Sequence, residues 1–203
     1  DNIKTIVHLA IEAEKPVHLL LSGPPASAKT LFLMELARLP EAYYCIAQTT
    51  SQAGLANLLF VYQPRYLLID EIDRLTGEHL GVLKSLMATG YISESKYGKT
   101  RGMELPTRVF AAGIRPHVLP KDLLSRFTQL KFASYTEPEF ILVSRSVLQS
   151  REGTPGDLAE LIAKRVWEKS ESSSDIRQVV QIARLCRGDV SKAEEVLRIL
   201  RKQ

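Results

Sequence analysis

The stretch that decides the fold is Leu19-Leu20-Leu21-Ser22-Gly23-Pro24-Pro25-Ala26-Ser27-Ala28-Lys29-Thr30. A short apolar run leads into a loop of small residues and prolines, and a helical pattern with Phe32 and Leu36 follows the loop. A phosphate-binding loop requires this order of strand, loop and helix. The amide groups of the loop and the positive end of the helix dipole can then face an anion. The stretch therefore predicts a site for the phosphates of a nucleotide.

Within this stretch, each residue type has an expected role. The predicted nucleotide-binding positions are Gly23, Pro24, Pro25, Ala26, Ser27, Ala28, Lys29, Thr30 and Leu31. We expect Lys29 to reach the β- and γ-phosphates and the Thr30 hydroxyl to take a place on Mg²⁺. The spacing matches G-x-x-x-x-G-K-[ST], except that the second glycine is Ala28. Because glycine lets the backbone approach phosphate closely, the methyl group of Ala28 is a potential clash.

A second signal is the apolar run Tyr66-Leu67-Leu68-Ile69, which ends in Asp70 and Glu71. Such a run is typical of a buried parallel strand, and ligands of open α/β sheets lie at the carboxyl ends of the strands. We therefore expect Asp70 beside the phosphate loop in a Mg²⁺-associated role. We expect Glu71 to act as the base that orients and polarises an attacking water. In the alternative interpretation, Glu71 only caps the next helix.

The rest of the chain indicates one α/β domain followed by a helical one. Strands are expected at residues 17–22, 43–47, 66–70, 107–113 and 129–132, with a β-hairpin at 91–106. Composition changes near residues 134–138, and helical stripes follow at 139–149, 156–169, 175–185 and 191–200. We predict a P-loop NTPase fold, with a parallel five-stranded sheet sandwiched by helices, over residues 1–134. A small all-α lid domain is expected over residues 135–203.

Composition narrows the class of protein. Of the 203 residues, 45% are hydrophobic and 25% are charged, as in ordinary globular proteins. We find no apolar stretch of about 18 residues and no signal-peptide pattern, so we expect no membrane span. Cys45 and Cys186 show no metal or redox spacing, which predicts two core residues in a reducing, cytoplasmic setting. The net charge of +4 permits a polyanionic partner without demanding one.

On these motifs, the sequence resembles the AAA+ ATPases over nearly its whole length. The phosphate loop, the strand ending in two acids, the hairpin, an Arg-Phe element and the helical lid appear in that family's order. The resemblance implies ATP and Mg²⁺ as cofactors, a nucleotide between the two domains, and self-association into a ring, commonly a hexamer. It also implies that Gly23 to Thr30 form the Walker A loop and that Asp70 and Glu71 form Walker B.

The resemblance assigns two further arginines. Arg126, in Leu-Leu-Ser-Arg-Phe, matches the arginine finger that reaches a neighbouring subunit's γ-phosphate. Arg177 matches the sensor-two arginine of the lid. The alternatives are a surface arginine after a helix for Arg126 and a solvated helix-face arginine for Arg177. The polar residue that usually ends the third core strand is absent near Gly113, and this departure, with Ala28, bears on hydrolysis more than on binding.

The hairpin bears on what such a protein would act on. It looks like the presensor hairpin of the branch that holds the MoxR-like ATPases and the minichromosome-maintenance helicases, while the lid is similar to that of RuvB-type helicases. Lys96, Lys99, Arg101 and Arg108 lie on or beside it. A basic hairpin in a ring pore would hold the phosphate backbone of DNA, and the alternative is a solvated loop of mixed charge.

Three functional hypotheses follow. The first is an ATP-driven DNA motor for branch migration or duplex opening. It is favoured because the turn at residues 48–52 lacks the aromatic residue with which protein-threading motors usually grip. The second is a MoxR-like chaperone that remodels a partner protein. The third is a nucleotide-gated scaffold in which Ala28 and Gly113 have slowed or removed turnover.

Overall fold

The structure is a computed structural model that describes residues 2–49, 52–75, 77–96, 99–170 and 175–200. The chain divides into two compact units, and each is described by itself. The first unit contains residues 1–23 and 28–132, and the second contains residues 24–27 and 133–203. The boundary expected from the sequence, between residues 134 and 135, stays a prediction.

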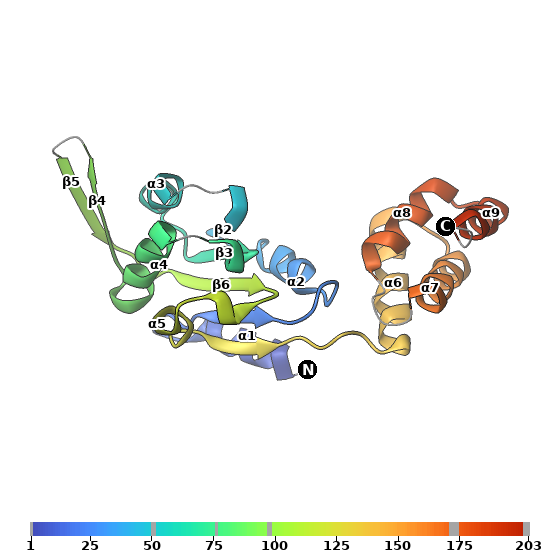
Figure 1. Ribbon diagram of the computed structural model, residues 1–203, viewed down its shortest axis with the longest axis horizontal. Coiled ribbons are helices and arrows are strands. Elements are labelled where there is room, and N and C mark those ends of the chain that lie inside the picture. The colour runs from blue at the N-terminus through green and yellow to red at the C-terminus, as the bar shows by residue number, and fades with distance from the viewer. Residues whose placement is uncertain (1, 50–51, 76, 97–98, 171–174, 201–203) are drawn as a thin grey trace. The chain divides into compact units, whose positions relative to one another are not determined.

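The first unit is built on five parallel strands in the order β2-β3-β6-β1-β7 (Figure 1). The strands are β1 (Leu19–Ser22), β2 (Ala42–Ile46), β3 (Tyr66–Asp70), β6 (Arg108–Gly113) and β7 (Thr128–Lys131). The helices are α1 (Asn2–Glu12), α2 (Lys29–Leu36), α3 (Gln52–Tyr62), α4 (Gly77–Thr89) and α5 (Lys121–Leu124). Short 3-10 turns are η1 (Ala47–Thr49), η2 (Ile72–Arg74) and η3 (Pro116–Val118). The predicted fold class is confirmed.

Both faces of the sheet are covered, which explains the continuous apolar runs of the central strands. Side chains alternate between the faces along each strand. Leu20 and Leu67 point into a core that also holds buried residues of α3, α4 and α5. Leu19 and Leu68 point the other way, into a core that they share with Leu33 of α2. Even-numbered residues of β3 therefore face the layer that contains α2.

The predicted hairpin forms a separate antiparallel pair, β4 (Tyr91–Lys96) and β5 (Lys99–Glu104). Tyr91 pairs with Glu104 at its base, and the hairpin extends away from the five-stranded sheet (Figure 1). One boundary differs from the sequence expectation, because α3 begins at Gln52, within the polar segment 49–54 that we interpret from sequence as a turn. Small and polar residues in the first turn of a helix give no apolar periodicity, so the pattern begins only at Leu55.

The second unit carries four helices in the described residues: α6 (Glu137–Glu152), α7 (Gly156–Ser170), α8 (Ile176–Cys186) and α9 (Val190–Leu200). Helix α6 begins with a capping box, in which the Thr136 N–H donates to Glu139 Oε2 at 2.9 Å. Asp175 caps α8 by accepting from the Arg177 N–H at 2.8 Å. Both cysteines are buried, as predicted. Among the described residues, no helix is long and apolar enough to cross a bilayer.

His18, just before β1, is a buried histidine that the fold keeps neutral. Its side chain is 8% exposed, and its Nδ1 accepts a hydrogen bond from the Val109 N–H at 3.1 Å. Burial lowers the pKa of His18 from its ordinary 6.5 to about 4, and the charges of Arg108 and Arg126 act in the same direction. Between these two pKa values, the unfolded chain binds a proton that the folded chain does not bind.

We therefore expect the free energy of unfolding to be highest above pH 6.5 and to fall as the pH drops toward 4. His18 alone should contribute a loss of about 2 kcal/mol between pH 7 and pH 4.5. Urea unfolding at both pH values measures this loss. His18→Asn, whose amide oxygen can replace Nδ1 as acceptor, should show a smaller loss, since only wild type carries the titrating ring. Equal losses in the two proteins would contradict the assignment.

Candidate functional site

The sheet brings the phosphate loop and the two acids to one edge. Strand β6 lies between β1 and β3, with Ser22 level with Gly113 and Ile69 level with Ala111. The carboxyl ends of β1 and β3 are therefore nearly level and, at two strand spacings, about 10 Å apart. Gly23, which follows β1, and the pair Asp70–Glu71 at the end of β3 therefore lie at the same edge of the sheet.

The phosphate loop is held by bonds within the loop itself. Lys29 is 7% exposed, and its Nζ donates to the Gly23 carbonyl at 2.9 Å. The Ser27 hydroxyl donates to the Pro24 carbonyl at 2.8 Å. A Cβ at Gly23 would lie 2.2 Å from the carbonyl oxygen of Phe132, so only glycine fits there. The first glycine thus serves packing against the end of β7, a reason that the motif alone does not reveal.

Ala28 adopts the conformation for which the motif normally uses glycine. Its φ of 64° and ψ of 7° are left-handed, and it is the residue just before α2. This conformation costs a residue with a Cβ about 1–2 kcal/mol. The turn forms in spite of the methyl group, and the helical ladder starts with the bond from the Phe32 N–H to the Ala28 carbonyl at 2.9 Å. The amides of Thr30 and Leu31 therefore precede the ladder, at the positive helix end that suits a phosphate.

Asp70 is a buried carboxylate with defined partners. It is 8% exposed, its Oδ1 accepts from the Glu71 N–H at 2.9 Å, and its Oδ2 accepts from the Tyr44 hydroxyl at 3.1 Å. As an even-numbered residue of β3, Asp70 faces the layer of α2, the helix that begins at the phosphate loop. Burial, and then the charge of Asp70, raises the pKa of Tyr44, so the phenol stays protonated as a donor.

Tyr44 is the residue of this site that sequence reasoning missed. In the sequence it is one of several residues that favour a strand, and nothing marks it as a partner of Asp70. The register of β2 and β3 creates the contact, because Tyr44 pairs with Leu68 and thereby reaches along the same face to Asp70. A tyrosine that orients a metal-associated carboxylate acts on the metal through that carboxylate.

Glu71 lies at the end of β3 with its side chain exposed to solvent. Its backbone is left-handed, with φ 55° and ψ 40°, and its carbonyl accepts from the Arg74 N–H at 2.8 Å. Glu71 occupies the N-cap position of η2, but its side chain makes no capping hydrogen bond there. Non-glycine residues held in this conformation often occur at functional sites.

The residues fit a metal that is held together with a triphosphate. Mg²⁺ usually binds through one or two protein oxygens plus phosphate oxygens and water. Thr30, at the start of α2, and Asp70, on the face toward α2, are the residues that would hold it. In the part of the chain that the structure describes, no group of three or more His, Cys, Asp or Glu residues gathers as a metal site. Phosphate oxygens and water would therefore have to complete the ligand set.

Arg126 lies at the opposite edge of the sheet from the phosphate loop. It is exposed and stands between α5 and β7, where the Thr128 N–H donates to the His18 carbonyl at 2.9 Å. Five residues of extended chain separate His18 from Gly23, which is about 16 Å. The structure records no hydrogen bond or ion pair of the Arg126 side chain with any described residue. Arg126 therefore lies near the amino end of β7, whereas the phosphate loop follows the carboxyl end of the parallel strand β1.

Arg177 belongs to the second unit and is described there alone. Its side chain is 77% exposed, and its Nε lies 3.6 Å from Asp175 Oδ2. The structure thus places Arg177 on the surface of its unit. Its contact with a nucleotide stays a prediction.

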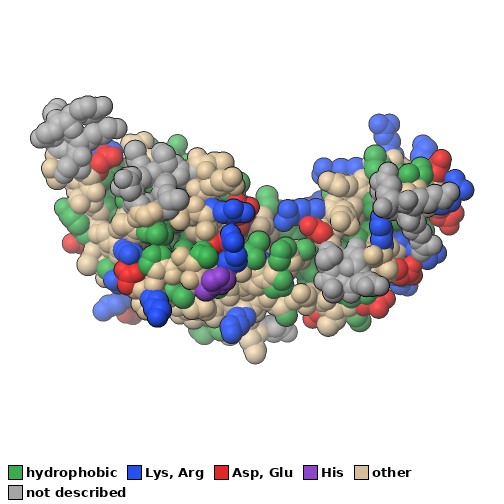
Figure 2. All heavy atoms as spheres, in the orientation of Figure 1, with side chains coloured by type: hydrophobic (Ala, Val, Ile, Leu, Met, Phe, Trp, Pro, Cys, Tyr) green, Lys and Arg blue, Asp and Glu red, His purple; other side chains and the backbone are tan. Residues whose placement is uncertain are grey.

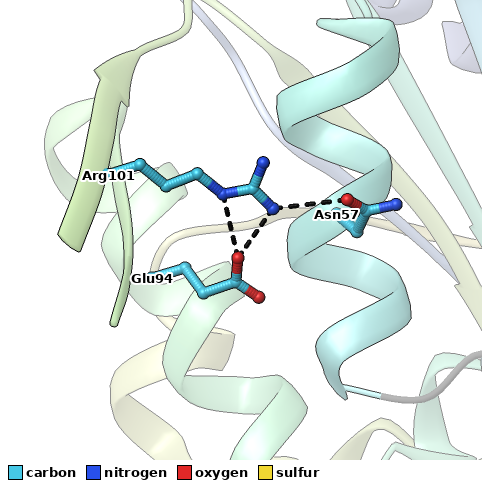
Figure 3. Close-up of polar contacts among 3 residues, drawn as sticks. All are labelled: Asn57, Glu94 and Arg101. Atoms are coloured by element: carbon cyan, nitrogen blue, oxygen red, sulfur yellow. Dashed lines mark hydrogen bonds and ion pairs between the residues drawn. The ribbon is translucent and has the colours of Figure 1, made fainter. Parts of the chain in front are cut away.

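Arg101 ties the hairpin to α3 (Figure 3). Its Nε and one terminal nitrogen donate to Glu94 Oε2 at 2.9 and 2.6 Å, and the same terminal nitrogen donates to Asn57 Oδ1 at 3.3 Å. The guanidinium also lies over the Phe60 ring, 4.1 Å from its centroid. Arg101 is therefore engaged within its own subunit. The side chains of Lys96 and Lys99 lie outside the part of the chain that the structure describes.

Arg108 corrects a second expectation about the hairpin. It is 4% exposed, its Nε donates to the Ala10 carbonyl at 3.0 Å, and a terminal nitrogen donates to the Ala13 carbonyl. It donates to carbonyls at the end of α1, so grouping it with the hairpin cations is wrong.

On the face that Figure 2 shows, Lys and Arg side chains lie interspersed with Asp and Glu side chains.

Comparison with known proteins agrees with this architecture. No family model matches the chain. Spastin from Xenopus tropicalis is 29% identical over 184 residues, which are 82% of this chain and 30% of spastin, so the chain spans about 30% of that relative's length. A RuvB mutant from Thermotoga maritima superposes with a TM-score of 0.73 at 23% identity, over 98% of this chain and 70% of that one. Another RuvB structure, described as a Holliday junction branch migration motor, gives a TM-score of 0.68 at 22% identity, over 98% of this chain and 68% of that one.

The likeness to RuvB shows the fold, and the likeness to spastin adds sequence similarity across most of the chain. Together they support the similarity to the AAA+ ATPase superfamily that the motifs predict.

Proposed function

We propose that the chain binds ATP with Mg²⁺ and hydrolyses it. The observation that supports the proposal is that β1, which leads to the buried Lys29 of a phosphate-type loop, and β3, which leads to Asp70 and Glu71, end at the same edge of the sheet. Lys29 and the first amides of α2 hold the phosphates, and Thr30 and Asp70 hold the metal. Glu71, exposed at the strand end, is placed to take a proton from water as it attacks the terminal phosphorus.

We propose that hydrolysis at this site requires subunits to assemble with one another. Phosphoryl transfer needs positive charge on the terminal phosphate, and Arg126 lies across the sheet from its own phosphate loop. A heterologous contact, in which the Arg126 edge of one subunit meets the loop edge of the next, generates a ring. The resemblance of the motifs to the AAA+ ATPases, which implies self-association into a ring, supports the proposal, and a hexamer is the expected size.

Glu71→Gln separates binding from chemistry. We expect the variant to bind ATP as wild type does and to lose turnover by about 10²-fold or more, because the amide cannot accept the proton of the attacking water. Equilibrium binding and steady-state phosphate release, each measured over a range of protein concentrations, test this. Equal turnover by Glu71→Gln and wild type would refute the assignment of Glu71. Nucleotide binding without turnover by wild type at any concentration would favour the scaffold hypothesis.

For the substrate, we propose DNA, with a MoxR-like role on a protein partner as the alternative. The sequence pI of about 9.1 and the fold shared with a branch-migration motor support DNA. The contacts of Arg101 shift the expected phosphate contacts on the hairpin toward Lys96 and Lys99.

We expect branched or duplex DNA to stimulate the ATPase, and stimulation should fall with added salt. The double change of Lys96 and Lys99 to Ala should remove stimulation while leaving the basal rate unchanged. Arg101→Ala removes a cation that is already bonded, so its direct effect on DNA affinity should be small. Absence of stimulation by branched, duplex and single-stranded DNA would favour the protein-remodelling alternative.

A further inference from the structure

The end of β6 has a glycine at the centre of the candidate site. Gly113 is level with Ser22, the residue before the phosphate loop, and β6 lies between the strands that carry the loop and the acids. A Cβ at residue 113 would lie 2.9 Å from Asp73 Oδ1 and 3.2 Å from Ile72 Cγ2. The space that a side chain at residue 113 would take is therefore occupied by the carboxylate of Asp73.

The side chain of Asp73 is buried, and the contacts that it makes with described residues are long. Its side chain is 5% exposed, its Oδ1 accepts from the Ile114 N–H at 3.4 Å, and its Oδ2 lies 3.8 Å from Arg115 Nε. Well-formed charge-assisted bonds measure about 2.7–2.9 Å. A buried carboxylate is unfavourable unless a cation balances it, and Arg115 is the cation recorded beside it. The Arg115 side chain is itself 54% exposed.

We propose that Arg115, positioned by Asp73, contacts the terminal phosphate of the nucleotide bound to its own subunit. It would supply the hydrogen-bond donor that Gly113 cannot supply. The proposal rests on the ATPase function proposed above. Arg115 follows the end of β6 by two residues, and β6 lies between β1, which leads to Gly23, and β3, which ends in Asp70. A guanidinium suits this task because its planar array of N–H groups matches phosphate oxygens.

A group that contacts the third phosphate and not the first two distinguishes ATP from ADP. We expect Arg115→Ala to lower turnover by about 10²-fold, as the loss of one preorganised donor does in other enzymes. The variant should also lose the preference for a nonhydrolysable ATP analogue over ADP, with ADP affinity within about twofold of wild type. Asp73→Ala should change both quantities in the same direction. Because Asp73 acts through Arg115, the double variant should lose no more turnover and no more preference for the ATP analogue than Arg115→Ala alone.

The experiment titrates the full chain with ADP and with the ATP analogue and measures turnover for wild type, both single variants and the double variant. Arg38→Ala is the matched control, since Arg38 also pairs with an acid, Glu35, at 2.9 Å and is exposed. Thermal unfolding tests whether each variant is folded. If Asp73→Ala is not folded, Arg115→Ala still tests the role of Arg115, because its side chain is half-exposed and its replacement should not disturb the fold.

The outcomes separate the two proposals. Wild type that binds neither nucleotide overturns the ATPase function and this inference together. Wild type that binds and hydrolyses ATP, with Arg115→Ala matching it in turnover and in preference, overturns this inference alone. Additive losses in the double variant overturn the positioning role of Asp73.

Discussion

Replacing Lys29 with alanine is expected to abolish nucleotide binding. The Lys29 ammonium group is buried at the base of the loop, 2.9 Å from the Gly23 carbonyl, and no other described lysine lies within the loop. Hydrogen bonds to charged groups contribute about 1.5–3 kcal/mol each. A lysine that reaches two phosphates should therefore account for about 10²-fold or more in affinity. Equilibrium titration with a fluorescent ATP analogue measures the loss.

Two further variants make the result of Lys29→Ala interpretable. Lys29→Met keeps the aliphatic volume and removes the charge, so it should lose affinity without the packing defect that alanine creates. Lys84→Ala is the matched control, because Lys84 also makes an ion pair, at 2.7 Å from Asp122, but lies on α4. Wild-type affinity in a folded Lys29→Ala variant would mean that this loop does not hold the phosphates.

The parts of the site that could be predicted from sequence are those in which chemistry and local structure coincide. The apolar run Leu19–Leu21, the small residues after it and Lys29 form one contiguous signal. The same holds for the strand that ends in Asp70 and Glu71. Because parallel strands bring their carboxyl ends to one edge, the meeting of these two segments could be expected before any coordinates.

What the sequence does not reveal are contacts between segments far apart in the chain. The bond from Tyr44 to Asp70 joins residues 26 apart, and the bond from Arg101 to Asn57 joins residues 44 apart. Arg108 looks like a surface cation until the fold places it against the carbonyls of α1, more than 90 residues earlier. Each of these contacts depends on strand register or helix packing, which one sequence pattern does not fix.

The glycine positions show the same division. From sequence, Ala28 in place of glycine suggests a clash with phosphate, whereas the structure shows a left-handed backbone that alanine tolerates at a cost of about 1–2 kcal/mol. From sequence, Gly113 stands where a polar residue is expected. The structure shows that the Asp73 carboxylate occupies the space that a side chain at residue 113 would take. In both places the structure adds a backbone conformation or a neighbouring side chain that the motif alone does not show.

Arg126→Ala should have the largest effect on turnover and little effect on ATP binding by an isolated subunit. The length of β1, about 16 Å of extended chain between His18 and Gly23, separates the Arg126 end of the sheet from its own phosphate loop. We therefore expect its charge to act on the terminal phosphate of a neighbour. An arginine supplied to the transition state from another subunit is worth about 10³–10⁵ in rate. Phosphate release at protein concentrations that favour assembly measures the loss. A monomer that hydrolyses ATP at the normal rate without Arg126 would rule the role out.

A mixing experiment distinguishes an arginine that acts on the neighbouring subunit from one that acts on its own. Arg126→Ala subunits keep Glu71, and Glu71→Gln subunits keep Arg126, so each variant alone lacks one half of every active site. In a mixed ring, some interfaces join an intact Glu71 to an intact Arg126. Random mixing of equal amounts should restore about one quarter of the wild-type rate. If Arg126 served its own subunit, every subunit of the mixture would lack one of the two groups, and the mixture would be no more active than its components.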